Sequence, residues 1–99
     1  MGYVSIINIG ETVYITERER DSSKASRVLG LIDQLPLVQL PATRTRILAA
    51  AHVKANAAIS YADAFVAAAA QEFGAVILTG DPEFRSIHRQ AVVEWLPTQ

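Results

Sequence analysis

The chain has 99 residues, of which 51% are hydrophobic and 19% charged, and its formal net charge is -1. This length supports one domain with one core, which we expect to span residues 1–99, and the composition excludes a disordered protein. The near-neutral charge excludes an overall basic field, so any nucleic-acid binding must depend on local patches. The chain has no cysteine, which excludes disulfides and thiolate metal sites. The pattern shows neither a membrane-spanning stretch nor a cleavable signal, so we expect a cytoplasmic protein without membrane association.

The first half of the chain alternates short strands with helices. A β-branched run predicts a strand at residues 2–5, followed by a helix that ends near Arg20. The apolar stripe of this helix is expected to consist of Ile6, Ile9, Gly10 and Val13. Ser22 or Ser23 can cap a second helix. The segment "PLVQLP" at residues 36–41 predicts a short strand between two prolines.

The second half of the chain begins with two more helices. Thr43 can cap a third helix and Ser60 a fourth, and Gly74 ends the fourth helix. The alanine-rich composition favours both helices. The buried stripe of the fourth helix is expected to consist of Ala62, Phe65, Val66, Ala69 and Phe73.

Two strands follow, with a short turn or helix between them at residues 82–90. The run "AVILT" at residues 75–79 is continuously apolar, as expected for a strand buried on both faces. The run "VVEWL" at residues 92–96 predicts the last strand. Strands that alternate with helices predict an α/β fold with a mostly parallel sheet flanked by helices. In such folds the carboxyl ends of strands and the amino ends of helices share one rim, where ligands bind.

Three carboxylates are predicted to lie on that rim. Glu11 is early in the first helix, Asp63 is in the first turn of the fourth helix, and Asp81 follows the strand at residues 75–79. Each carboxylate also has a local explanation. Ser60-x-x-Asp63 fits a capping box, Asn8-x-x-Glu11 resembles one loosely, and Asp81 precedes a proline as a helix cap often does.

Clustered carboxylates are suited to divalent-metal chemistry. Oxygen ligands select hard cations such as Mg²⁺ or Mn²⁺. Without a metal ion, neighbouring carboxylates repel and at least one takes up a proton. With metal ions, such a site can activate water and clamp a phosphodiester for in-line displacement. His52 and His88 are isolated, and the chain has neither of the common glycine-rich phosphate-binding motifs.

Two long segments resemble the PIN domain, specifically the VapC-type toxin nucleases of prokaryotic toxin–antitoxin pairs. The segment "VSIINIGETVYITERER" resembles the family's strand and the helix that carries its glutamate, which is Glu11 here. The segment "ISYADAFVAAAAQEFGAVILTGDPEF" resembles the helix with an aspartate, here Asp63, and the strand that ends in Thr-x-Asp, here Thr79 and Asp81. The segment "LPLVQLP" falls where the family has its edge strand, so the resemblance covers nearly the whole chain.

The resemblance implies a PIN-like sheet and an endoribonuclease that depends on Mg²⁺ or Mn²⁺. Glu11, Asp63 and Asp81 would hold the metal, and water would be the nucleophile that hydrolyses the RNA phosphodiester. A cognate antitoxin would hold the enzyme inactive, and the protein would form a homodimer.

The chain departs from the family at its amino end. The family begins with a strand that bears its first acidic ligand, followed by helices, and this N-terminal part of roughly 30 residues is missing here. No acidic residue precedes Glu11, which leaves the activity of the chain open. The missing strand would lie between strands 2–5 and 75–79. We expect either that these strands pair directly or, as we favour, that another chain fills the gap.

Basic residues near Asp81 are the first candidates for RNA contact, and solvated surface charge is the alternative for each. These candidates are Arg85, His88 and Arg89, with Arg44, Arg46 and Lys54 in the third helix as further ones. Tyr61 and Trp95 could stack on a base, and core or interface packing is the alternative for Trp95. Two other functions stay open: a non-catalytic module that binds an antitoxin or dimerises, and a plain α/β domain whose three acids are caps.

Overall fold

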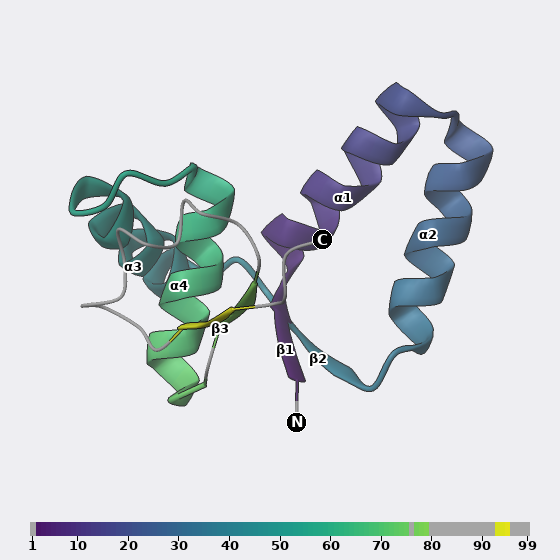
Figure 1. Cartoon of the computed structure of the whole chain (residues 1–99). Coiled ribbons are helices and arrows are strands. Elements are labelled where there is room, and N and C mark those ends of the chain that lie inside the picture. Colours follow the sequence, from purple (N-terminus) through teal and green to yellow (C-terminus); the bar gives the residue numbers. More distant parts are fainter. Residues whose placement is uncertain (1, 76, 80–92, 96–99) are drawn as a thin grey trace. The chain divides into compact units, whose positions relative to one another are not determined.

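Figure 1 shows the computed structural model of the chain, which describes residues 2–75, 77–79 and 93–95. The chain divides into two compact units, Met1–Ala42 and Thr43–Gln99, and each is described by itself. Helices and strands alternate and the strands pair in parallel, which confirms the predicted α/β class. The elements in chain order are β1 (Gly2–Ser5), α1 (Ile6–Glu19), α2 (Ser22–Gln34), β2 (Leu37–Leu40), α3 (Arg44–Ala55), α4 (Tyr61–Phe73), β3 (Ile77–Thr79) and β4 (Val93–Trp95).

In the first unit, β1 continues directly into α1. Ser5 is the last residue of β1 and also the N-cap of α1, where its Oγ accepts a hydrogen bond of 3.2 Å from the Ile7 N–H. β1 and β2 pair in parallel, with a register that runs from Gly2 opposite Leu37 to Ser5 opposite Leu40. The predicted strands at residues 2–5 and 36–41 are thus confirmed.

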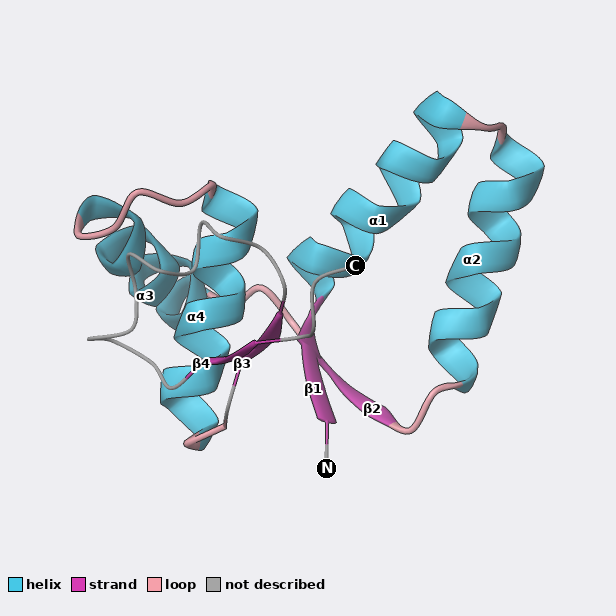
Figure 2. Ribbon diagram, in the orientation of Figure 1, coloured by secondary structure: helices cyan, strands magenta, loops and turns pink. Residues whose placement is uncertain are grey.

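Helices α1 and α2 lie side by side and are joined by a short turn (Figure 2). Ile9 of α1 and Ala25 of α2 are buried in this unit. Val13 and Thr16 follow Ile9 at i+4 and i+7 and are half-buried, so the buried face of α1 centres on Ile9. The predicted stripe was therefore wrong in part, because Ile6 is 42% exposed and Gly10 is exposed.

The cap of α2 also differs from the prediction. Neither Ser22 nor Ser23 caps this helix; Asp21 does, and its Oδ1 accepts a hydrogen bond of 2.7 Å from the Lys24 N–H. A carboxylate forms a charge-assisted hydrogen bond with a helix N-terminus and also interacts favourably with the helix dipole. This explains why the aspartate, rather than a following serine, takes the capping position.

The second unit begins with two packed helices, α3 and α4. The predicted caps are confirmed: Thr43 Oγ1 accepts from the Arg46 N–H at 3.3 Å, and Ser60 Oγ accepts from the Asp63 N–H at 3.1 Å. Gly74 ends α4 with a φ of 60°, a left-handed conformation that only glycine adopts without strain.

The buried face of α4 differs from the predicted stripe. Phe65 is buried as expected, but Ala62, Val66 and Ala69 are only half-buried, and Phe73 is exposed. The other buried residues of this helix are Ala64, Ala67, Ala68 and Ala70. Because α4 is apolar around most of its circumference, its periodicity does not single out one face, and the small alanine side chains allow close helix packing.

The two remaining strands, β3 and β4, pair in parallel, with Ile77 opposite Val93 and Thr79 opposite Trp95. The predicted strand at residues 92–96 is confirmed over 93–95, and the one at residues 75–79 is confirmed over 77–79, whereas Ala75 lies before the strand. The described strands form two separate two-stranded sheets, β1–β2 and β3–β4. Strands 2–5 and 75–79 belong to different compact units, so both alternatives for them, direct pairing or a gap filled by another chain, stay predictions. The expected turn or helix at residues 82–90 lies outside the described residues.

Candidate metal centre and nucleic-acid contacts

Glu11 lies in α1 beyond the positions that can cap this helix. The N-cap is Ser5, so the acceptor position of a capping box, three residues after the cap, belongs to Asn8. The explanation of Glu11 as a cap is therefore wrong. Its side chain is half-buried, and it forms neither a hydrogen bond nor an ion pair within the described part of the chain. Ile7 and Ile15, at i-4 and i+4, are half-buried too, so Glu11 interrupts a largely apolar stripe.

Asp63 lies in the first turn of α4 and is half-buried. Its backbone N–H donates to Ser60 Oγ, which is one half of the predicted capping box. A carboxylate at this position also interacts favourably with the positive end of the helix dipole. The local explanation thus applies to Asp63, and it is compatible with a second role as a metal ligand.

The third predicted ligand, Asp81, lies outside the described residues. Glu11 belongs to the first compact unit and Asp63 to the second. Within residues 2–75, 77–79 and 93–95, no three metal-ligating side chains form a group. The convergence of Glu11, Asp63 and Asp81 on one ion stays a prediction.

The chemistry of the predicted ligands nevertheless fits a hard divalent cation. All three are carboxylates, which Mg²⁺ and Mn²⁺ prefer, and the chain has no thiolate to favour a softer metal. The donor set therefore fits the group that the resemblance implies.

Arg46, one of the further candidates for RNA contact, is engaged within the protein. Its Nε and Nη2 donate to the two carboxylate oxygens of Glu72 at 3.0 and 3.2 Å, which joins α3 to α4. Its guanidinium also lies 6.0 Å from the centre of the Phe73 ring. Arg44 and Lys54 are exposed on α3.

The remaining nucleic-acid candidates stay predictions. Arg85, His88 and Arg89 lie outside the described residues, and Trp95 is placed as part of β4. Tyr61 is exposed at the start of α4, where its ring makes an edge-to-face contact with Phe65 at 5.1 Å between ring centres. That geometry is compatible with stacking on a base, and it equally serves to order the helix start.

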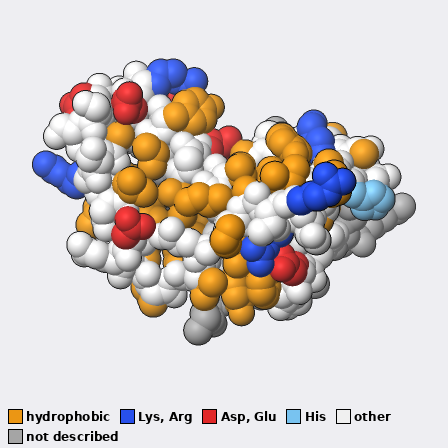
Figure 3. Space-filling view, turned by 180° about the vertical axis from the view of Figure 1, so that it is seen from behind, with side chains coloured by type: hydrophobic (Ala, Val, Ile, Leu, Met, Phe, Trp, Pro, Cys, Tyr) orange, Lys and Arg blue, Asp and Glu red, His pale blue; other side chains and the backbone are white. Residues whose placement is uncertain are grey.

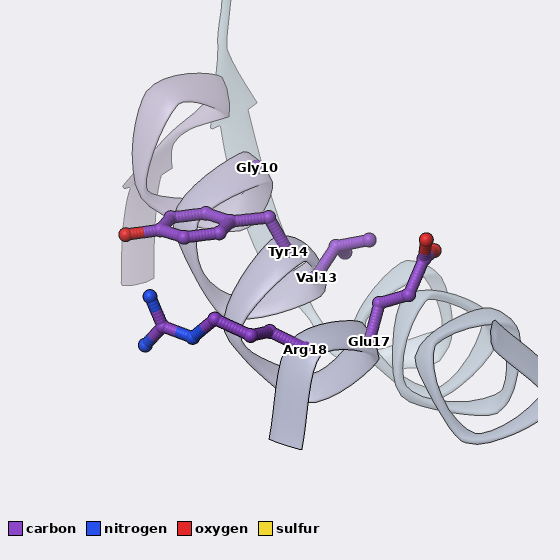
Figure 4. Close-up of a pocket in the computed structure, with 5 residues that line it drawn as sticks. All are labelled: Gly10, Val13, Tyr14, Glu17 and Arg18. Carbon is purple, nitrogen blue, oxygen red and sulfur yellow. The ribbon is translucent and has the colours of Figure 1, made fainter. Parts of the chain in front are cut away.

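A shallow depression on α1 was missed by the sequence analysis. It is lined by Gly10, Val13, Tyr14, Glu17 and Arg18, and its volume is about 360 Å³ (Figure 4). These residues follow the helical spacing i, i+3, i+4, i+7 and i+8, which places them on one face. That spacing was visible in the sequence, but Gly10 and Val13 were assigned to the buried stripe instead.

These observations define a parallel α/β protein with half-buried carboxylates in two of its helices, Glu11 in α1 and Asp63 in α4. The PIN domain family model matches residues 1–90, and the chain belongs to the PIN domain family. Membership of this family suggests a nuclease-type function and RNA as the substrate, and PIN domains generally depend on divalent metal ions. A search of curated proteins found no match. Among the helices that the structure describes, none is long and apolar enough to cross a membrane.

Proposed function

We propose that the protein is a metal-dependent endoribonuclease of the VapC type, the toxin of a toxin–antitoxin pair. The observation that carries this proposal is the match to the PIN domain family over residues 1–90. It is supported by Glu11, a half-buried carboxylate that has no helix-capping role and that forms no ion pair within the described residues.

Glu11, Asp63 and Asp81 are the residues that would hold Mg²⁺ or Mn²⁺. When bound, such an ion supplies activation of water and neutralisation of charge on the phosphodiester. The role of the chain is to present carboxylate oxygens from Glu11 within α1, from Asp63 in the first turn of α4 and from Asp81, which follows β3 in the sequence. Arg85, His88 and Arg89, which follow Asp81 in the sequence, would contact phosphates and offset the repulsion between RNA and an acidic site.

A cleavage assay on single-stranded RNA tests this function. The purified chain is incubated with Mn²⁺, with Mg²⁺ or with EDTA, and we expect cleavage only with a metal ion. Glu11→Gln, Asp63→Asn and Asp81→Asn are each expected to abolish cleavage. Glu19→Gln is the matched control for Glu11→Gln, because Glu19 is an exposed carboxylate on the same helix, and it should retain full activity. A folded parent chain that cleaves no RNA with either metal would refute the proposal.

A second candidate function is a non-catalytic module that binds a cognate antitoxin or forms a homodimer. Exposed apolar side chains favour it: Leu31 and Leu35 at the end of α2 are 57% and 52% exposed. Apolar side chains also reach the surface elsewhere in the described part (Figure 3). Exposed surfaces of this kind often mark interaction sites. The same cleavage assay discriminates the two, because this module would associate without cleaving RNA.

A further inference from the structure

The depression on α1 lies between two rows of side chains. Tyr14 and Arg18 extend to one side of the helix, and Val13 and Glu17 extend to the other (Figure 4). Gly10 lies at the head of the depression, where it contributes no side chain. Among the described residues, the lining is mixed in character, with one aromatic ring, one guanidinium, one carboxylate and one aliphatic side chain.

Gly10 is the residue that leaves this space open. It lies within α1, it is exposed, and an added Cβ would meet nothing within 4 Å. Packing therefore does not require a glycine here, although glycine destabilises a helix relative to alanine. An added Cβ at Gly30 in α2 would also meet nothing within 4 Å. An exposed helical glycine alone therefore does not mark a binding site. What distinguishes Gly10 is its place four residues before Tyr14, where a larger side chain would pack against the ring.

Tyr14 and Arg18 form a platform on one side of the depression. The Tyr14 side chain is exposed, and the Arg18 guanidinium carbon lies 5.4 Å from the centre of its ring. This cation–π contact orders both side chains. Arg18 also meets Glu19 at 4.0 Å, but both side chains are highly exposed, so the ion pair is weak. The guanidinium therefore keeps N–H donors for a phosphate.

We propose that this depression binds a base of single-stranded RNA. The base contacts the open surface of the Tyr14 ring above Gly10, and the Arg18 guanidinium contacts the adjoining phosphate. The choice of RNA as the ligand rests on the proposed ribonuclease function. An apolar peptide fits less well, because two of the described lining residues, Glu17 and Arg18, are charged.

The test is a binding measurement on the full chain in EDTA, which separates binding from cleavage. Fluorescence anisotropy with a labelled single-stranded RNA oligonucleotide gives the Kd. Tyr14→Ala is expected to raise Kd by about tenfold, the scale of losing one base–aromatic stack. Gly10→Leu covers the ring and should also weaken binding. Gly30→Leu is the matched control: both leucines should stabilise their helices, and only the one at position 10 should change Kd. Arg18→Gln should weaken binding and reduce its salt dependence.

The outcomes separate this inference from the ribonuclease proposal. Unchanged Kd values for Tyr14→Ala and Gly10→Leu, in a parent that binds and cleaves RNA, would overturn the inference alone. Loss of RNA binding in both variants, in a parent that does not cleave, would support the inference and refute the nuclease activity. If both variants instead lost binding to a cognate antitoxin peptide and kept RNA binding, the depression would belong to a protein partner and the inference would be wrong. A parent without RNA binding would overturn both.

Discussion

The substitution Asp63→Asn separates the two explanations of this carboxylate, helix cap and metal ligand. The hydrogen bond from the Asp63 N–H to Ser60 Oγ, at 3.1 Å, involves only the backbone of Asp63 and should survive. The carboxylate charge near the N-terminus of α4 is lost, which should lower the free energy of unfolding by about 0.3–1 kcal/mol. If the three acids cluster, the substitution also relieves their repulsion. The metal-free variant should therefore stay within about 1 kcal/mol of the parent, or exceed it.

Metal binding should change the free energy of unfolding more than the loss of the Asp63 charge at the start of α4 does. A ligand present at a hundred times its Kd, and bound only by the folded state, stabilises that state by about 2.7 kcal/mol. Urea unfolding of the parent with Mn²⁺ should show a gain of this order over the same measurement in EDTA. Asp63→Asn should lose most of this gain, because one of the three proposed carboxylate ligands becomes a neutral amide.

Asp21→Asn is the matched control for that experiment. Asp21 is also an aspartate at a helix start, and its Oδ1 accepts from the Lys24 N–H at 2.7 Å, so it is a cap with no proposed metal role. We expect a small loss of stability, equal in Mn²⁺ and in EDTA. The reasoning would be refuted if Mn²⁺ did not stabilise the parent, or if Asp63→Asn kept the whole of the metal effect.

Three further predictions concern stability and assembly. Gly74→Ala should lower the free energy of unfolding by about 1–2 kcal/mol, because alanine is strained at a φ of 60°. Gly30→Ala, in an open helical position, should instead raise the free energy of unfolding by up to about 1 kcal/mol. Equal effects of the two substitutions in urea melts would contradict this prediction. A double-mutant cycle of Arg46→Met and Glu72→Gln should give a coupling of at most about 1 kcal/mol, since the paired side chains are 26% and 42% exposed; coupling that does not weaken with added salt would count against a solvent-screened pair. Sedimentation at micromolar concentration should show a homodimer, and a compact monomer that unfolds in one cooperative transition would defeat that prediction while supporting a single domain over residues 1–99.

Local signals predicted the elements better than they predicted the faces of the helices. Thr43, Ser60 and Gly74 start and end their helices as expected, because each acts through a short-range hydrogen bond or a single backbone angle. The cap of α2 was displaced by one residue because serine and aspartate compete for the same role. The stripe of α4 was misassigned because an alanine-rich helix offers several apolar faces, and only its packing against α3 decides which is buried.

The predicted site depends on contacts that local pattern does not determine. Glu11 and Asp63 were both placed early in helices, and α1 and α4 begin where that argument requires. Their convergence with Asp81 depends on how segments distant in the sequence are arranged. The expectation that strand carboxyl ends and helix amino ends share one rim holds within one continuous parallel sheet. The described strands form two pairs.

Glu11 and Asp63 looked alike in the sequence, but the effects of substituting them have different explanations. Both lay three residues after a polar residue, which fitted a capping box, yet only Asp63 follows the actual N-cap of its helix by three residues. A substitution of Asp63 therefore changes the stability of α4 as well as any metal binding, and Asp21→Asn is needed as the control for the first of these effects. Glu11 lies beyond the capping positions, and its carboxylate forms no hydrogen bond or ion pair within the described residues. A loss of metal-dependent stability in Glu11→Gln would consequently have no helix-capping explanation, so Glu11 is the more decisive position for the proposed metal centre.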